Sequence, residues 1–253
     1  MSNLSNSPLT GLPVLLFDFD DTLSEQIHFN TQYVRGIGGV LAERFGGEGE
    51  DWAKSAIDML VALEAEYIAQ FETMHTGYNT WYAGMHMAAM SRVFAGMGRD
   101  VPEGAEQLSH ETQRLAMAQC DAIFPGVRET LFQLKEAGYT LHLASGNDSL
   151  HLQRALVGAG LASLFERHYG PDLIDCVKEG PLYYERIFAD LNLTPQQAVV
   201  IDNDPNALTW AISLGAQAIQ VDFLPYKQVP IVHGTLAHVR SFAEIYAVLT
   251  KRS

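Results

Sequence analysis

The apolar residues of this chain follow two different patterns. Val14 to Asp18 form a short, mostly apolar run after Pro13, which is typical of a buried strand. Between about Ser24 and Asp121 the apolar residues instead recur at helical spacing, with glycines between the segments. Four helices are predicted there: Phe29 to Phe45, Trp52 to Phe71, Tyr78 to Met97 and Glu106 to Cys120. This part has no strand pattern, so we expect it to be entirely helical.

From Pro125 onward, predicted strands and helices alternate. The strands are expected at Tyr139 to Ala144, Ala198 to Ile201 and Ala216 to Val221. The helices are expected at Val127 to Ala137, Ser149 to Ala159, Pro181 to Leu191, Ala207 to Leu214 and Phe242 to Leu249. Strands separated by helices in this way indicate parallel βαβ units, and therefore a doubly wound, mainly parallel sheet of the α/β class.

The helical part is predicted to be an insertion into the α/β part. The strand at Val14 to Asp18 has no partner close to it in sequence and must therefore pair within the later sheet. We expect an α/β core built from residues 1–23 and 122–253, and an all-α domain of residues 24–121. Ligands of open α/β sheets bind at the carboxyl ends of the strands, so candidate chemistry is expected there.

Composition is that of a folded, globular chain. Hydrophobic residues make up 47% of the 253 positions and charged residues 18%, which is enough apolar material for a core. No apolar run is long enough to span a bilayer, so no membrane association is expected. Met1 to Thr10 lack the basic start and apolar stretch of a secretion signal and are expected to form a loose tail. Two cysteines fit a reducing, cytoplasmic location better than a disulfide framework.

The net charge restricts the possible partners. A formal charge of −14 repels polyanions at long range, so we expect no nucleic acid partner. A small phosphorylated substrate is still compatible with it, because a metal ion and one or two local cations can reverse the field inside a pocket. The oligomeric state is not indicated by any feature of the sequence.

An acidic cluster stands at the end of the first predicted strand. Asp18, Asp20 and Asp21 fall within four positions, with Thr22 next. Ionised carboxylates this close repel one another and resist removal from water. A divalent cation makes such a cluster tolerable, and an all-oxygen ligand set suits Mg²⁺. Taken alone, the motif has a solvated acidic turn as its alternative interpretation.

Three further segments carry polar residues beside a predicted strand end or helix start. Ser145 and Gly146 follow a strand, where a hydroxyl and free backbone N–H groups can cradle a phosphate, although helix capping is the alternative. Lys178 precedes a helix and can neutralise a phosphoryl group or a carboxylate, although an isolated lysine is more often solvated. Asp202 ends another strand and could share a metal with the first cluster, whereas Asp204 equally suits a helix N-terminus.

Taken in order, these segments resemble the four motifs of the haloacid dehalogenase (HAD) superfamily of phosphohydrolases. The family motifs are an Asp-x-Asp-x-Thr strand end, a Ser or Thr after the second strand, a Lys before a helix, and an acidic strand end. The matching residues are Asp18, Asp20, Thr22, Ser145, Lys178 and Asp202. The likeness covers about Leu12 to Leu23 and Phe124 to Val221, and the position of the helical part suits the helical cap of the family.

The resemblance implies a Rossmann-like HAD core with a cap, and Mg²⁺-dependent hydrolysis of a small phosphorylated metabolite. It implies that Asp18 is the nucleophile that forms an aspartyl-phosphate, and that Asp20 is the acid and base. The phosphate-binding residues that it implies are Thr22, Ser145, Gly146 and Lys178. The metal ligands that it implies are Asp18, Asp202 and Asp20, the last through its backbone carbonyl.

One motif departs from the family pattern. The last motif commonly carries a second acid, but Asn203 and Asn206 occupy the matching positions and Asp204 lies between them. Asp202 is therefore the expected metal ligand, and the roles of Asn203 and Asp204 stay open. Glu25 and His28 follow the nucleophile loop closely and could face the site or lie in a solvated loop.

Several activities share these motifs. A halide leaving group needs no proton, and the dehalogenase branch of the family normally lacks the second Asp, so Asp20 favours phosphate esters. Base rates favour hydrolysis over a sugar phosphomutase, and a catalytically idle phosphate-sensing or interaction protein is a third reading. Substrate choice is expected in the cap. The segment Met74 to Tyr82 with Met85, His86 and Met87 could line a pocket there, although such residues at helical spacing are more often core.

Overall fold

A single sheet of parallel strands organises the core in the computed structural model, which describes residues 13–74 and 77–251. The strand order is β3-β2-β1-β4-β5-β6. The strands are β1 (Val14–Phe17), β2 (Thr140–Ala144), β3 (Arg167–Tyr169), β4 (Ala198–Asp202), β5 (Gln217–Val221) and β6 (Ala237–Val239). The predicted doubly wound α/β class is thus confirmed, while the predicted tail at Met1 to Thr10 lies outside the described residues.

Helices cover both faces of this sheet because successive side chains of each strand point to opposite faces. Leu15 and Phe17 of β1 pack in one cluster with α5 (Val127–Glu136), α6 (Ser149–Gly158) and α10 (Phe242–Thr250). Leu16 packs on the other face with α8 (Pro181–Asp190) and α9 (Pro205–Ser213). The short helix α7 (Pro171–Ile174) and two 3₁₀ turns, Ala162–Leu164 and Pro195–Gln197, complete the core.

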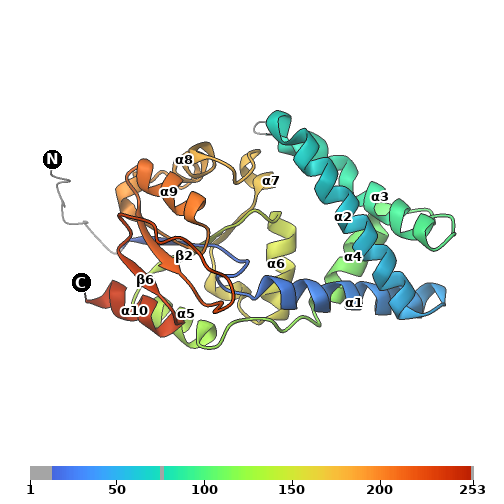
Figure 1. Cartoon of the computed structure of the whole chain (residues 1–253), viewed down its shortest axis with the longest axis horizontal. Coiled ribbons are helices and arrows are strands. Elements are labelled where there is room, and N and C mark those ends of the chain that lie inside the picture. Colours follow the sequence, from blue (N-terminus) through green and yellow to red (C-terminus); the bar gives the residue numbers. More distant parts are fainter. Residues whose placement is uncertain (1–12, 75–76, 252–253) are drawn as a thin grey trace.

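Four helices between β1 and α5 form the part that Figure 1 shows to one side of the sheet. They are α1 (Gln26–Phe45), α2 (Gly49–Met74), α3 (Tyr78–Gly96) and α4 (Ala105–Met117). Helices α1 and α2 pack so closely that a Cβ added to Gly38 would lie 2.2 Å from the backbone oxygen of Gly49. We call these four helices the cap. The division into two domains at residues 24 and 121 stays a prediction.

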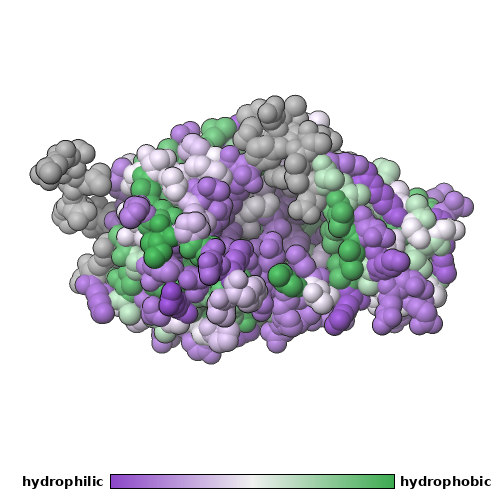
Figure 2. Space-filling model, viewed as in Figure 1, coloured by the Kyte–Doolittle hydropathy of each residue, from purple (hydrophilic) through white to green (hydrophobic). Residues whose placement is uncertain are grey.

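The chain leaves the core and returns to it at one place. Ser24 and Ile123 form an antiparallel bridge, and the backbone N–H of Glu25 donates to the oxygen of Ala122 at 2.9 Å. The space-filling view shows a hollow between the core and the cap, and the surface that borders it over α2 is hydrophobic (Figure 2). Within the described part of the chain, none of the helices combines the length and apolarity needed to cross a membrane.

Candidate active site

Strand order brings three of the predicted motifs to one point. The central strand β1 pairs with β2 on one side and β4 on the other, with Phe17 opposite Leu143 and Ile201. The residues that follow these strands therefore meet at their carboxyl ends. This is the position at which doubly wound sheets bind ligands. Asp18, which directly follows β1, donates its backbone N–H to the oxygen of Ile201 at 2.9 Å.

Lys178 joins two of the motifs in a buried ion triad. Its ammonium lies 2.8 Å from Oδ1 of Asp18 and 2.7 Å from Oδ2 of Asp202. A third hydrogen bond runs from Nζ to the backbone oxygen of Ala144 at 2.9 Å. All three donor positions of the lysine are used, so its place at the strand ends is well defined.

Burial dominates the acid–base behaviour of this triad. Removal from water raises the pKa of Asp18 and raises that of Asp202 to about 7, while the Lys178 ammonium opposes both shifts. Burial would lower the pKa of Lys178, but the two adjacent carboxylates raise it well above its usual value. The lysine therefore stays charged at neutral pH, between two carboxylates that it only partly neutralises.

Asp20 is held by residues just before helix α6 and at the start of α1, within electrostatic reach of Lys178 and Asp18. Its Oδ2 accepts hydrogen bonds from Nδ2 of Asn147 at 2.8 Å and Nε2 of Gln26 at 3.4 Å. Burial raises the pKa of Asp20, the Asn147 hydrogen bond lowers it, and the negative charge of Asp21 raises it. A carboxyl group with a raised pKa and a fixed orientation is suited to donating a proton to a leaving group.

The third carboxylate of the acidic cluster has a structural role. Oδ1 of Asp21 accepts from the backbone N–H of Gln26 at 3.0 Å, at the start of α1. Oδ2 accepts from Nζ of Lys227 at 2.7 Å. The φ angle of Asp21 is +55°, in the left-handed region that Asp tolerates better than most residues. Asp21 therefore orients the turn between β1 and the cap.

Of the predicted phosphate-binding residues, three lie at the strand ends or beside open space, and the fourth is fully buried. Lys178 and Ser145 lie at the strand ends, and a Cβ added to Gly146 would meet no atom within 4 Å, which leaves open space beside its backbone. Oγ of Ser145 accepts from the backbone N–H of Asn147 at 3.4 Å. Thr22 is fully buried, and its hydroxyl donates to Oδ1 of Asn203 at 3.2 Å. Thr22 thus ties the loop after β1 to the loop after β4.

Three residues whose roles the sequence left open form hydrogen bonds away from the ion triad. Asp204 caps helix α9, because its Oδ1 accepts from the backbone N–H of Asn206 at 3.0 Å. Oε1 of Glu25 accepts from the hydroxyl of Tyr226 at 2.9 Å. His28 is exposed and shares a hydrogen bond of 2.8 Å with Gln32. Their side chains therefore have partners outside the triad.

The donor set fits a magnesium ion with few protein ligands. The described residues contain no group of three or more His, Cys, Asp or Glu side chains that could hold a metal. Lys178 uses one oxygen of Asp18 and Oδ2 of Asp202, and Oδ1 of Asp202 accepts from the backbone N–H of Asp204 at 2.8 Å. A carboxylate oxygen has two lone pairs, so each carboxylate keeps one or more for a metal ion. Mg²⁺ is usually bound through one or two carboxylates, with waters and substrate oxygens completing its shell. Asp18 and Asp202 meet that requirement, and the carboxylate of Asp20 is engaged with Asn147.

Two kinds of contact in the site had no clear sequence signal. Asn147, in the turn after β2, donates a hydrogen bond to Asp20, and Asp148 caps α6. The hydroxyl of Tyr183 donates to the backbone oxygen of Ser145 at 2.8 Å, which fixes the turn after β2. A tyrosine on a predicted helix gives no hint of such a contact, although its position shortly after Lys178 could have suggested proximity.

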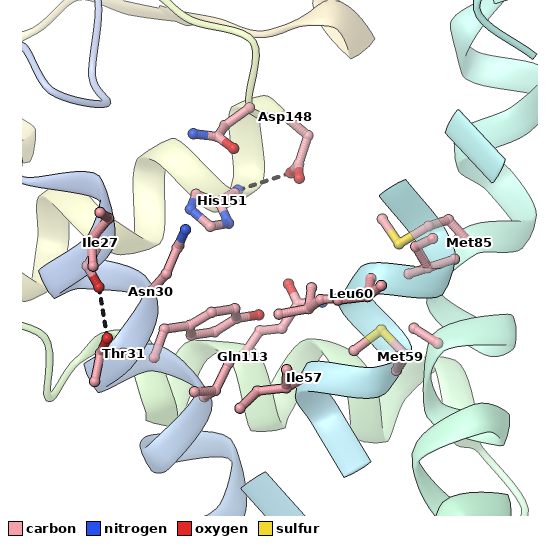
Figure 3. Close-up of a pocket in the computed structure, with 16 residues that line it drawn as sticks. Ile27, Asn30, Thr31, Ile57, Met59, Leu60, Met85, Gln113, Asp148 and His151 are labelled. Atoms are coloured by element: carbon pink, nitrogen blue, oxygen red, sulfur yellow. Dashed lines mark hydrogen bonds between the residues drawn. The ribbon is translucent and has the colours of Figure 1, made fainter. Parts of the chain in front are cut away.

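A cavity of about 600 Å³ opens between the cap and the N-terminal end of α6. Figure 3 shows Leu60 of α2 and Met85 of α3 facing Asp148 and His151 across it, while Asn30 of α1 lies beside His151. Of the cap segment predicted to line a pocket, Met85 does so, whereas Tyr82 donates to Oδ1 of Asp148 at 2.9 Å and His86 is buried. Residues 75 and 76 of that segment lie outside the described residues.

Comparisons with known proteins agree with this arrangement. The phosphoglycolate phosphatase of Haemophilus influenzae is 26% identical over 130 residues, covering 50% of this chain and 57% of that protein. The match thus spans little more than half the length of that relative. A 2-haloacid dehalogenase of Pseudomonas syringae has a similar structure, with a TM-score of 0.68, 18% identity and coverage of 96% of this chain and 100% of that one. A magnesium-bound HAD hydrolase of Bacillus subtilis has a TM-score of 0.60 and 15% identity, with coverage of 94% of this chain and 98% of that one.

At these identities the structural likenesses show the fold alone. The family itself is shown by sequence, because the model of the haloacid dehalogenase-like hydrolases matches residues 12–215. That range includes Asp18, Ser145, Lys178 and Asp202 as well as the whole cap. The chain belongs to the haloacid dehalogenase-like hydrolase family.

Proposed function

We propose that this hydrolase is a magnesium-dependent phosphatase that cleaves a small phosphate monoester through an aspartyl-phosphate on Asp18. The observation that carries the proposal is the oriented carboxyl group of Asp20. Burial raises its pKa, and hydrogen bonds from Asn147 and Gln26 fix its orientation. Asp20 lies two positions after Asp18 in the sequence. An alkoxide leaving group needs a proton donor of this kind, whereas a halide does not.

Two displacements complete the proposed reaction. An oxygen of Asp18 attacks phosphorus, the ester P–O bond breaks, and the leaving oxygen takes the proton of Asp20. A water molecule then attacks the same phosphorus while the Asp20 carboxylate accepts one of its protons. The bond between phosphorus and the Asp18 oxygen breaks, which releases phosphate and restores both carboxyl groups to their starting state.

Charge compensation makes the first step feasible. Lys178 lies 2.8 Å from Asp18 and offsets part of the repulsion between a carboxylate and a phosphate. Asp18, Asp202 and the backbone carbonyl of Asp20 are the proposed holders of Mg²⁺, which would supply further positive charge to the phosphoryl oxygens. Ser145 and Gly146 are proposed to bind those oxygens from the turn after β2, beside the open space at Gly146.

The proposed chemistry is tested by phosphate release from 4-nitrophenyl phosphate and from an alkyl phosphate. Activity is expected to require Mg²⁺ and to disappear with a chelator. Asp18→Asn is expected to lower kcat by about 10³-fold or more, because the nucleophile is removed. Asp20→Asn is expected to lower kcat for the alkyl ester by about 10²–10⁴-fold.

Asp204→Asn is the matched control, because it changes an acid of the same loop region while asparagine still caps a helix. Its kcat is expected to stay within about threefold of the wild type. Equal activity of the wild type and Asp18→Asn would contradict the proposal. So would chloride release from 2-chloropropionate that is faster than phosphate release and independent of Mg²⁺. Recovery of phosphate on the product, in place of free phosphate, would indicate phosphoryl transfer.

A further inference from the structure

The cavity between the cap and α6 has a mainly apolar wall on its cap side. Ile57 and Leu60 of α2 and Met85 of α3 line it, and Figure 3 shows them on the side opposite His151. Val61 also lines it and is 60% exposed, although a large apolar side chain gains free energy when it is covered. Several such side chains around one hollow therefore leave a surface that an apolar ligand would cover.

This cavity adjoins the proton donor of the proposed reaction. Asn147 lines the cavity, and the same side chain donates to Oδ2 of Asp20 at 2.8 Å. A leaving group that takes its proton from Asp20 therefore lies next to the cavity mouth. Helix α1 reaches the same region, because Gln26 contacts Asp20 and the following residue, Ile27, lines the cavity.

The described wall offers no cation to a charged leaving group. Its ionisable members are Asp148, His151 and Tyr33. Burial lowers the pKa of His151 and raises that of Tyr33, so both are neutral at pH 7. Arg154, on the same helix as His151, donates to Gln113 at 2.9 Å and offsets the charge of Asp148 without being part of the wall. Residues 55–91, which include most of α2 and α3, contain four acids and no lysine or arginine.

We propose that the leaving group of the natural ester is uncharged, mainly apolar, and larger than a two-carbon acid, and that it occupies this cavity. The inference rests on the proposed phosphatase activity and extends it to a substrate class. Glycolate, the leaving group of phosphoglycolate, carries a carboxylate that would find no cationic partner on this wall. A two-carbon group would leave most of this cavity of about 600 Å³ to water.

A set of esters with graded leaving groups tests the proposal. Phosphate release is measured with phenyl, 1-naphthyl and 4-carboxyphenyl phosphates and with phosphoglycolate, all with Mg²⁺. Each buried methylene-sized group is worth up to about fourfold in affinity, so kcat/KM for the naphthyl ester is expected to exceed that for the phenyl ester by about tenfold or more. The two carboxylated esters are expected to be the poorest substrates.

A matched pair of variants separates the cavity from general surface effects. Val61→Lys places a cation on the cavity wall, at a valine that is 60% exposed. Val157→Lys places a cation on α6, at a valine that is 62% exposed and does not line the cavity. Val61→Lys is expected to lower kcat/KM for naphthyl phosphate and raise it for 4-carboxyphenyl phosphate, which shifts their ratio by about tenfold or more. Val157→Lys is expected to leave that ratio unchanged.

Several results would overturn the inference. One is a preference for phosphoglycolate or 4-carboxyphenyl phosphate that still depends on Asp18, which would leave the phosphatase proposal standing. Another is the same ratio in both lysine variants. A third is a change of molar mass in light scattering with Val61→Lys at an unaltered substrate ratio, because the apolar wall would then join two copies of the chain. Absence of phosphate release from every ester would instead refute the proposed function, and this inference with it.

Discussion

Replacing Lys178 with methionine tests how the candidate site is held together. The Lys178 side chain is only 9% exposed, and its ammonium is the cation between two buried carboxylates, at 2.8 Å from Asp18 and 2.7 Å from Asp202. Methionine keeps much of the side-chain volume and removes the charge. Breaking a buried ion pair by removing one partner typically costs about 3–5 kcal/mol, because it leaves an uncompensated charge in the interior. We expect a loss of that size in the free energy of unfolding at pH 8.

The pH dependence of this loss follows from the pKa values of the carboxyl groups. Burial raises the pKa of Asp202 to about 7, so the folded wild type carries this group ionised at pH 8 and protonated at pH 5. A folded-state pKa above the unfolded value makes a contribution to stability that is full at low pH and is lost as the pH rises. Removing Lys178 raises the pKa values of Asp18 and Asp202 further. Each unit by which a pKa rises corresponds to about 1.4 kcal/mol of free energy between the ionised and protonated forms. Because the pKa of Asp202 lies only about one unit below pH 8, this group is expected to make the cost of Lys178→Met up to about 1.4 kcal/mol smaller at pH 5 than at pH 8.

Urea denaturation at the two pH values, without divalent ions, measures both quantities. Lys227→Met is the control, because Lys227 also pairs with one carboxylate, Asp21 at 2.7 Å, but its side chain is 46% exposed. An exposed pair of this kind is worth about 0–1 kcal/mol. Equal losses for the two variants would refute the argument from burial. An equal loss for Lys178→Met at pH 5 and pH 8 would refute the assignment of the cost to ionised carboxylates.

Two further variants examine other parts of the structure. Asn147→Ala removes the hydrogen bond to Asp20, so kcat for an alkyl phosphate is expected to fall by about 10–100-fold. The fall is expected to be smaller for 4-nitrophenyl phosphate, because its leaving group needs less protonation. Equal losses for both esters would contradict the role of Asn147 in proton donation. His142 lies in β2, and burial lowers its pKa to about 4, so its contribution to stability is full above its unfolded pKa of about 6.5 and is lost as the pH falls toward 4. Between pH 6 and pH 5, urea denaturation is expected to show about 1 kcal/mol more loss in the wild type than in His142→Leu, and identical pH profiles would refute this.

Much of the fold could be predicted from the sequence, because most of its helices and strands have an apolar pattern within their own residues. The helix expected at Tyr78 to Met97 is observed at Tyr78–Gly96, and the strand expected at Ala198 to Ile201 at Ala198–Asp202. The strands β3 and β6 were missed. β3 is only three residues long and contains Arg167 and His168, so its extended conformation is specified by pairing with β2 and not by an apolar pattern of its own.

The candidate site divides in a similar way. Residues at or directly after the end of an apolar strand, such as Asp202 and Asp18, were identifiable, and the structure joins them through Lys178. The hydrogen-bond partners of the polar side chains were not identifiable, because these residues are far apart in the sequence and meet only in the folded chain. Thr22 and Asn203 are hydrogen-bonded although 181 positions separate them. Asn147 reaches Asp20 across 127 positions, which no local spacing rule describes.

The contrast between the buried triad and the exposed cavity wall has a consequence for how such a protein can evolve. Asp18 is 6% exposed, and any change there disturbs charges that the interior must balance. Ile27, Ile57 and Val61 stand at the surface, where substitutions usually change stability by no more than about 0.5 kcal/mol. Mutations can therefore accumulate around the mouth of the cavity without threatening the fold. A lineage carrying this chain could explore new substrates while its chemistry stayed constant.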